Sequence, residues 1–194
     1  MSEEFMKSAL ERALERAESI DVPEEKMREL ENKPAAEQIA ASFLGSNEFN
    51  IVAALKEYDP EKRELLIKLV ESILLQNLIL PVKEMDITRN EKVFHGLASY
   101  KKDQQGIKKA KEQLQNLSNY YAQATKQNYD QLKVEIERAM SEAMKQQPGM
   151  NSQVKFDVAQ STEFQEKWRQ LVGRLNMEYG KALADLKQSI VQMS

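Results

Sequence analysis

The sequence predicts an all-α protein, in which a helical-bundle head is followed by a long antiparallel helical hairpin formed by the two C-terminal helices. The first observation is composition: 194 residues contain only 6 glycines and 5 prolines, with many of the strong helix formers Ala, Leu, Glu, Lys and Gln. The second is that apolar residues recur at helical spacing along most of the chain. Hydrophobic residues make up 41% of the sequence, which is enough for a sizeable core at this length.

These patterns predict three parts. Residues 1–32 form an amphipathic N-terminal helical arm, residues 35–105 a helical head, and residues 106–194 the long hairpin, with a loop at 147–161. The arm carries one apolar stripe, made of Phe5, Met6, Ala9, Leu10, Ala13, Leu14, Ala17 and Ile20. This stripe can pack on the protein's own core, or dock into a partner or a second copy. Binding to a membrane surface is less favoured, because the polar face of this helix has no excess of basic residues.

Proline and glycine mark the expected helix ends in the head. Pro23 predicts the start of a short helix that reaches Leu30, and Pro34 predicts the start of the next one. Gly45 fits the C-terminal cap of that second helix, and Asn47 is a candidate cap for a third.

Residues 59–61, with the sequence DPE, are a strong helix start signal, in which a capping residue precedes proline and an acid. The predicted helix runs to Leu80 and ends before Pro81. Its polar side includes Lys68 and Glu71, so we expect Glu71 to be exposed or paired. Its core face consists of Leu65, Leu66, Leu69, Val70, Ile73 and Leu74.

A longer helix is predicted over residues 89–146. Residues 88–91 (TRNE) fit a capping box, and no proline follows until Pro148. Unbroken, this helix would measure roughly 88 Å. Gly106 interrupts it at a cost of about 1 kcal/mol relative to alanine, so the helix is either continuous or bent there, at the predicted boundary of head and stalk. A seven-residue recurrence predicts a coiled-coil seam through Val93, Tyr100, Ile107, Leu114 and Tyr121, with Ala110, Leu117 and Ala124 beside it.

A second capping box at residues 162–165 (TEFQ) predicts the start of the last helix. This helix would span roughly 47 Å, too short to cover the long one, so the hairpin pairs residues 107–146 with 162–193. In the connecting loop, residues 154–158 alternate as in a strand but are too few to establish one. The last helix buries a wide stripe of Phe164, Trp168, Leu171, Val172, Leu175, Tyr179, Ala182, Leu183, Leu186 and Ile190.

Catalytic and metal-binding patterns are missing from the sequence. The chain has no cysteine, which excludes disulfides, thiolate metal sites and cysteine nucleophiles, and its one histidine is His95. Neither a G-x-S-x-G elbow nor a phosphate loop is present. Glu91 and His95 are four residues apart, whereas a di-iron bundle needs Glu-x-x-His on two helices. We therefore predict no catalytic, cofactor-binding or metal residues, no cofactor, and no enzymatic activity.

The charge is unevenly distributed, with 12 basic and 19 acidic residues in 1–90 but 16 basic and 12 acidic residues in 91–194. A lysine cluster in the basic half suggests nucleic-acid binding as an alternative function. A solvated helix face that points away from the apolar stripe explains the same lysines without any ligand. The cluster consists of Lys101, Lys102, Lys108, Lys109 and Lys111, with Lys126, Lys133 and Arg138 further along the chain.

The favoured interpretation is a non-enzymatic protein-interaction, assembly or scaffold protein, which binds a protein partner or a second copy as a homodimer. The amide-rich segment 115–131 (QNLSNYYAQATKQNYDQ) suits a wet, hydrogen-bonding interface. A second alternative is a small-molecule binder with a pocket in the head. The longest apolar stretch, residues 69–80, is too short to span a membrane, so we expect a cytoplasmic protein with no membrane partner.

Overall fold

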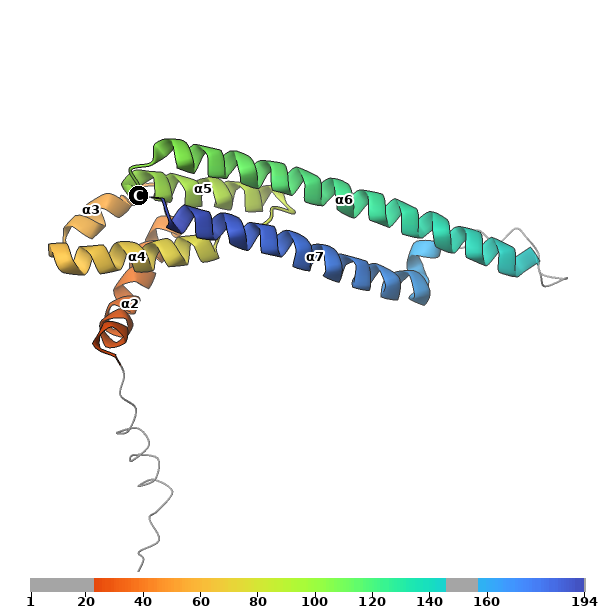
Figure 1. Cartoon of the computed structure of the whole chain (residues 1–194), viewed down its shortest axis with the longest axis horizontal. Helices are drawn as coiled ribbons and strands as arrows, with labels where there is room; N and C mark the ends of the chain where they lie inside the picture. The colour runs from red at the N-terminus through yellow and green to blue at the C-terminus, as the bar shows by residue number, and fades with distance from the viewer. Residues whose placement is uncertain (1–22, 146–156, 194) are drawn as a thin grey trace, which may run out of the picture. The chain divides into compact units, whose positions relative to one another are not determined.

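A computed structural model describes residues 23–145 and 157–193 of the chain (Figure 1). These residues form six α-helices and one short 3₁₀ helix, with no strand among them, so the all-α prediction is confirmed. The chain divides into two compact units, Met1–Ile73 and Leu74–Ser194. The predicted stripe of the N-terminal arm and most of the predicted 147–161 loop lie outside the described residues. The predicted division into arm, head and hairpin stays a prediction.

The first unit begins with helix α2, Glu24–Gly45, which is continuous through Pro34. The predicted break at this proline is therefore wrong. Proline removes one backbone donor, and the carbonyl four residues earlier, on Leu30, loses its helical partner. Leu30 is 57% exposed, so water can satisfy that carbonyl and the helix continues. The C-terminal half of α2 buries Ala36, Ile39, Ala40 and Phe43.

Helix α3, Ile51–Lys56, is held at both ends by side chains. Asn50, rather than the predicted Asn47, caps its start by accepting a hydrogen bond from the backbone N–H of Ala53 at 3.0 Å. At its end, the Arg63 guanidinium donates to the carbonyl oxygens of Leu55 and Tyr58 at 3.1 and 2.7 Å. Arg63 thus satisfies carbonyls that a helix C-terminus leaves without partners.

Helix α4, Pro60–Gln76, starts where the sequence predicts, because the Asp59 carboxylate accepts from the backbone N–H of Lys62 at 3.0 Å. It ends four residues before the predicted Leu80. Its core face includes the buried residues Leu66, Val70 and Leu74. Glu71 is only 8% exposed, so of the two predicted alternatives, exposed or paired, the first does not hold.

In the second unit, helix α5, Glu84–Tyr100, starts four residues before the predicted capping box. Asp86 accepts hydrogen bonds from the backbone N–H groups of Val82 and Lys83 at 3.0 and 2.9 Å. Thr88 lies inside the helix, where its hydroxyl donates to the carbonyl oxygen of Glu84. An acid at the first turn is favourable at the positive end of the helix dipole, so Asp86 takes the role predicted for Thr88.

The predicted 89–146 helix is broken at residues 101–103, where the chain turns back into helix α6, Gln104–Lys145. The break lies just before Gly106 and is stabilised by Asp103, whose carboxylate accepts from the Gly106 backbone N–H at 2.8 Å. A Cβ atom at position 106 would collide with that carboxylate, so glycine makes room for the cap.

Lys101 in this turn is buried, with 8% exposure, and its ammonium donates to the carbonyl oxygen of Met193 at 2.7 Å. The prediction that Lys101 points into solvent is wrong. The interruption of the helix at residues 101–103 directs the long Lys101 side chain inward, where its ammonium satisfies a carbonyl group just beyond the end of α7.

We expect Lys101→Met to lower the free energy of unfolding by about 1.5–3 kcal/mol, because a charge-assisted hydrogen bond is lost while the apolar stem is kept. Amide hydrogen exchange near Met193 should become faster. Urea unfolding and exchange mass spectrometry measure both effects. The exposed neighbour gives the control: Lys102→Met should change neither quantity, and equal effects of the two changes would contradict this role of Lys101.

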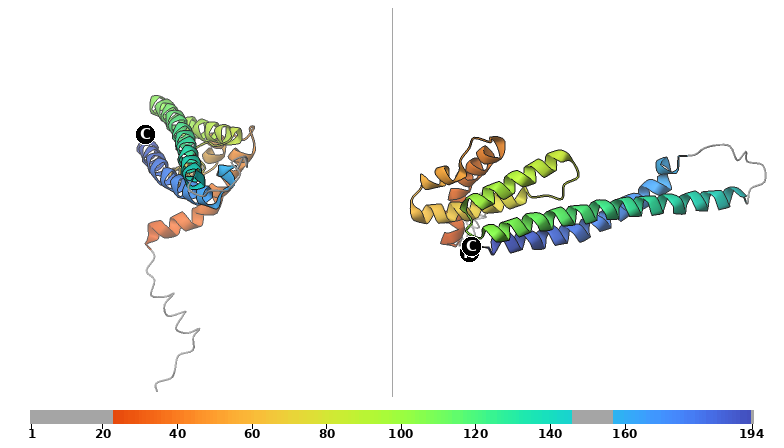
Figure 2. Two further views of the ribbon diagram at one scale, coloured as in Figure 1. Left: turned by 90° about the vertical axis from the view of Figure 1, so that its right-hand side faces the viewer. Right: turned by 90° about the horizontal axis from the view of Figure 1, so that it is seen from above.

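Helix α7, Thr162–Val191, runs antiparallel to α6 in the views of Figures 1 and 2. Ser161, one residue before the predicted capping box, caps it by accepting from the Phe164 backbone N–H at 3.2 Å. The Tyr121 hydroxyl donates to the Asn176 side-chain oxygen at 2.6 Å, and the Tyr121 and Tyr179 rings meet edge to face at 5.2 Å. The predicted coiled-coil geometry of this pair stays a prediction.

A second hydrophobic core lies at the far end of α6 and α7, where the 3₁₀ helix η1, Val158–Gln160, also packs. The buried residues of this distal core are Leu132, Ile136, Val158 and Phe164. The Tyr129 ring packs edge to face on Phe164 and on Trp168, at 5.1 Å in each case. The predicted packing of Phe164 and Trp168 as core residues is thus confirmed.

Candidate protein-binding groove

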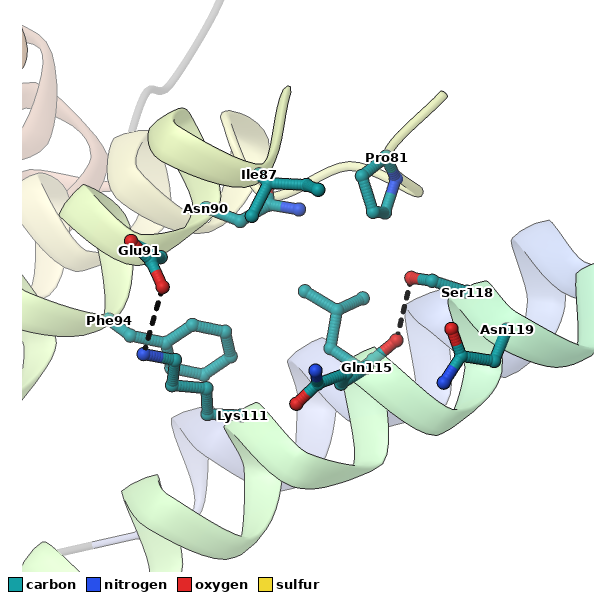
Figure 3. A pocket seen from close by; sticks show the side chains of 10 residues that line it. Pro81, Ile87, Asn90, Glu91, Phe94, Lys111, Gln115, Ser118 and Asn119 are labelled. Carbon is teal, nitrogen blue, oxygen red and sulfur yellow. Dashed lines mark hydrogen bonds and ion pairs between the residues drawn. The ribbon is translucent and has the colours of Figure 1, made fainter. Parts of the chain in front are cut away.

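A groove with a volume of about 170 Å³ lies between α5, α6 and the chain just before α5 (Figure 3). Its apolar lining comes from Pro81, Ile87, Phe94 and Leu114. Ile87 and Phe94 are seven residues apart, which places them on one face of α5, two turns apart. Phe94 and Leu114 are each 4% exposed, whereas Ile87 is 51% exposed at the mouth. The groove is therefore apolar inside and open to solvent.

Polar groups surround this apolar lining. The Lys111 ammonium and the Glu91 carboxylate form an ion pair at 3.4 Å, shown as a dashed line in Figure 3. Both side chains are half exposed, so the pair contributes little to stability. The Ser118 hydroxyl donates to the carbonyl oxygen of Leu114 at 2.7 Å. On the same helix, Gln115 and Asn119 add uncharged hydrogen-bonding groups to the lining.

Asn90 fixes the wall of the groove to the chain before α5. Its side-chain oxygen accepts from the Ile79 backbone N–H at 3.0 Å, and its amide nitrogen donates to the Ile79 carbonyl at 2.7 Å. Asn90 is only 5% exposed. One side chain thus satisfies both backbone groups of Ile79, in the segment that leads to Pro81.

Three strongly exposed apolar residues lie at or just before the start of α5, and one of them, Ile87, lines the groove. Val82 is 76% exposed, Met85 78% and Ile87 51%. We call these three residues the rim patch. Single exposed apolar residues are common, but neighbouring ones beside an apolar groove indicate an interaction site. Asp86 lies among them and, through its hydrogen bonds to the backbone of Val82 and Lys83, fixes the turn that presents them.

The pKa of Asp86 lies below its ordinary value of 3.8, because the backbone N–H groups of Val82 and Lys83 stabilise the carboxylate. A lowered folded-state pKa adds stability that is complete above pH 3.8 and is lost as the pH falls through the folded-state value. We therefore expect the Val82 amide resonance to titrate below pH 3.8 in an NMR pH series. In Asp86→Asn that titration should disappear, and a midpoint above 3.8 in the unmodified chain would contradict the cap.

The predicted lysine cluster does not form one exposed patch. Lys101 is buried, and Lys111 pairs with Glu91. Lys102, Lys108 and Lys109 are exposed. Because Lys101 is buried and the charge of Lys111 is offset by Glu91, the basic surface is smaller than the sequence suggests.

The other sequence candidates can also be placed. His95 is exposed on α5, and no group of three or more potential metal ligands occurs among residues 23–145 and 157–193. In the first unit, an open hollow of about 530 Å³ between α2 and α4 is lined mainly by charged side chains, including Glu25, Arg28, Glu64 and Lys68. Small-molecule sites are mostly apolar cavities of about 300–1,000 Å³. The groove is smaller than this, and the hollow is lined mainly by charged side chains, so neither matches that class well.

In the comparison with known proteins, a family model matches residues 52–192, which include all of α4 to α7. The chain belongs to the DUF6657 family. The family is described as one of unknown function. No curated protein and no solved structure matches the chain. The groove and the rim patch lie inside the matched range. Among the described residues of this DUF6657 protein, no helix is both long enough and apolar enough to cross a membrane.

Proposed function

We propose that this DUF6657 protein is a non-enzymatic interaction protein that binds a protein partner through the groove between α5 and α6. The observation that carries the proposal is the rim patch beside that groove. Exposed Val82, Met85 and Ile87 provide apolar contact area, and the neighbouring groove gives a partner side chain a place to insert. Aromatic or aliphatic anchors that fill such hollows usually dominate the affinity of protein interfaces.

The size and lining of the groove favour a side chain over a free metabolite. Its volume of about 170 Å³ is below that of typical ligand pockets but accommodates one large apolar side chain. Phe94 and Leu114 offer no hydrogen bond to a polar ligand. Gln115 and Asn119 on α6 can bind the partner backbone around the anchor. The partner is therefore a protein segment with an apolar anchor and a largely uncharged surrounding surface.

Site-specific photo-crosslinking in cells tests this function. A photoreactive amino acid in place of Val82, next to the lining residue Pro81, should give a discrete protein adduct, whereas the same group in place of Gln170 on α7 should not. The captured protein, once purified, should bind the full chain at least tenfold more weakly after Ile87→Glu, because a carboxylate then enters an apolar site. The matched control Met177→Glu, at an exposed apolar residue of α7, should leave binding unchanged. Equal binding by both variants would overturn the proposal.

Nucleic-acid binding remains the alternative, and its support is the exposure of Lys102, Lys108 and Lys109. It predicts an affinity for mixed-sequence RNA or DNA that falls steeply with added salt. Fluorescence anisotropy at low salt measures that affinity. Absence of binding under those conditions would remove the alternative.

A further inference from the structure

The middle of α6 has no buried core. The buried residues of this helix are Ile107, Ala110 and Leu114 near its start, and Leu132 and Ile136 in the distal core. Between Leu114 and Leu132, all seventeen positions of the helix are half-buried or exposed. Along this stretch α7 covers one side of the helix through half-buried residues such as Tyr121, and a second helix would add stability by packing on the exposed side.

One side of α6 is exposed along this stretch and carries a single charged residue. Its members Asn116, Tyr120, Gln123, Gln127, Asp130 and Val134 follow one another at spacings of four, three, four, three and four residues. That spacing places them on a single face, which we call the outer face. All six are exposed, and Tyr120 and Val134 are each 63% exposed. Depletion of charge, here to Asp130 alone, is typical of the centre of an interface.

The outer face is complementary to itself when two copies run antiparallel. Tyr120 and Val134 each lie seven residues from Gln127. A twofold axis at Gln127 therefore places each Tyr120 opposite Val134 of the second copy. Such an interface uses the same surface on both subunits, so the twofold axis creates two equivalent contacts between Tyr120 of one copy and Val134 of the other.

The positions of the nearest charged residues are also complementary about this twofold axis. Lys126 and Asp130 are the only charged residues between positions 115 and 131; Asp130 lies on the outer face, and Lys126 lies one turn before it along one edge of that face. Their midpoint, Asn128, is one residue from Gln127. In an antiparallel pair the same edges of the two helices meet, so each lysine lies beside the aspartate of the second copy. A parallel pair would instead bring identical charges to the same level.

From these observations we propose that the outer face of α6 forms an antiparallel homodimer, with the twofold axis at Gln127. The occupant is a second copy of this chain, because the apolar residues and the charges both match themselves about nearly the same point. The proposal does not depend on the partner groove, whose lining shares no residue with the outer face.

The absence of cysteine allows a direct crosslinking test on the full chain. Tyr120→Cys is mixed with a size-tagged Val134→Cys chain and treated with a short bismaleimide. An antiparallel dimer gives mainly the mixed crosslinked product, because each introduced thiol faces the other kind. A parallel dimer gives mainly the two homodimeric products, and either that result or no dimeric product would overturn the proposal.

Analytical ultracentrifugation provides the second measurement. The full chain should sediment as a dimer of its 22.3 kDa mass. Gln127→Glu places two carboxylates at the axis and should weaken dimerisation at least tenfold, whereas Gln165→Glu on α7 should not. Lys126→Asp should also weaken the dimer, and adding Asp130→Lys should restore it.

These results are separable from those of the partner groove. Ile87→Glu should leave the dimer intact, and Gln127→Glu should leave partner binding intact. A chain that stays monomeric at all concentrations would contradict the homodimer alone. A dimer unaffected by Gln127→Glu would show that copies meet elsewhere and would also contradict it.

Discussion

Replacing Phe164 with alanine is expected to lower the free energy of unfolding by about 3–5 kcal/mol. Phe164 is 2% exposed and joins the distal core with Leu132, Ile136 and Val158. Its ring also supports Tyr129 at 5.1 Å, so truncation removes an edge-to-face contact as well as buried area. Because few other residues are buried at this end of α6 and α7, little nearby structure can collapse into the cavity.

Urea unfolding followed by circular dichroism measures the loss, and hydrogen exchange locates it. Faster exchange should be concentrated around the distal core and be weaker near the α5–α6 turn. Gln165→Ala, at the exposed next position, is the matched control and should change stability by less than about 0.5 kcal/mol. A loss below about 1 kcal/mol for Phe164→Ala would show that the distal core contributes little.

Asn90→Ala is expected to cost about 2–4 kcal/mol, because both the N–H and the carbonyl group of Ile79 lose their partner at once. The two bonds measure 3.0 and 2.7 Å, and Asn90 itself is 5% exposed. Asn90→Asp retains the acceptor for the Ile79 N–H but places an anionic oxygen beside the Ile79 carbonyl. We therefore expect Asn90→Asp to be destabilising as well.

Thermal and urea unfolding of both variants check these values. Gln170→Ala, at an exposed position on α7, serves as the control and should be near neutral. Partner binding should also weaken in Asn90→Ala, because Pro81 is no longer fixed beside the groove. Unchanged stability in Asn90→Ala would contradict this role, because it would mean that water replaces both hydrogen bonds of Asn90 to Ile79 at no cost in free energy.

Helix content and several helix ends could be predicted because they depend on local interactions. Asp59 caps α4 through a bond three residues away, and the start of α7 was missed by only one residue. The break after Tyr100 depends on tertiary contacts instead. Lys101 ends α5 and binds the carbonyl of Met193, which is distant in sequence and carries no local pattern.

The groove could not be predicted for the same reason. A continuous 89–146 helix places α5 and α6 end to end, whereas the three-residue turn at 101–103 folds them side by side. Only then do Ile87 and Phe94 face Leu114 and Ser118. The seven-residue spacing of Ile87 and Phe94 was visible in the sequence, but their partner helix was not.

The affinity of the full chain for a peptide selected against it from a random display library tests the central claim most directly. We expect peptides that share an apolar anchor and bind at least tenfold more weakly to Ile87→Glu, and to Ser118→Phe, which fills the groove. Met177→Glu, at an exposed apolar residue of α7, should bind them as tightly as the unmodified chain. Peptides whose affinity is equal for all four proteins, measured by fluorescence anisotropy, would contradict a protein-binding function of this groove.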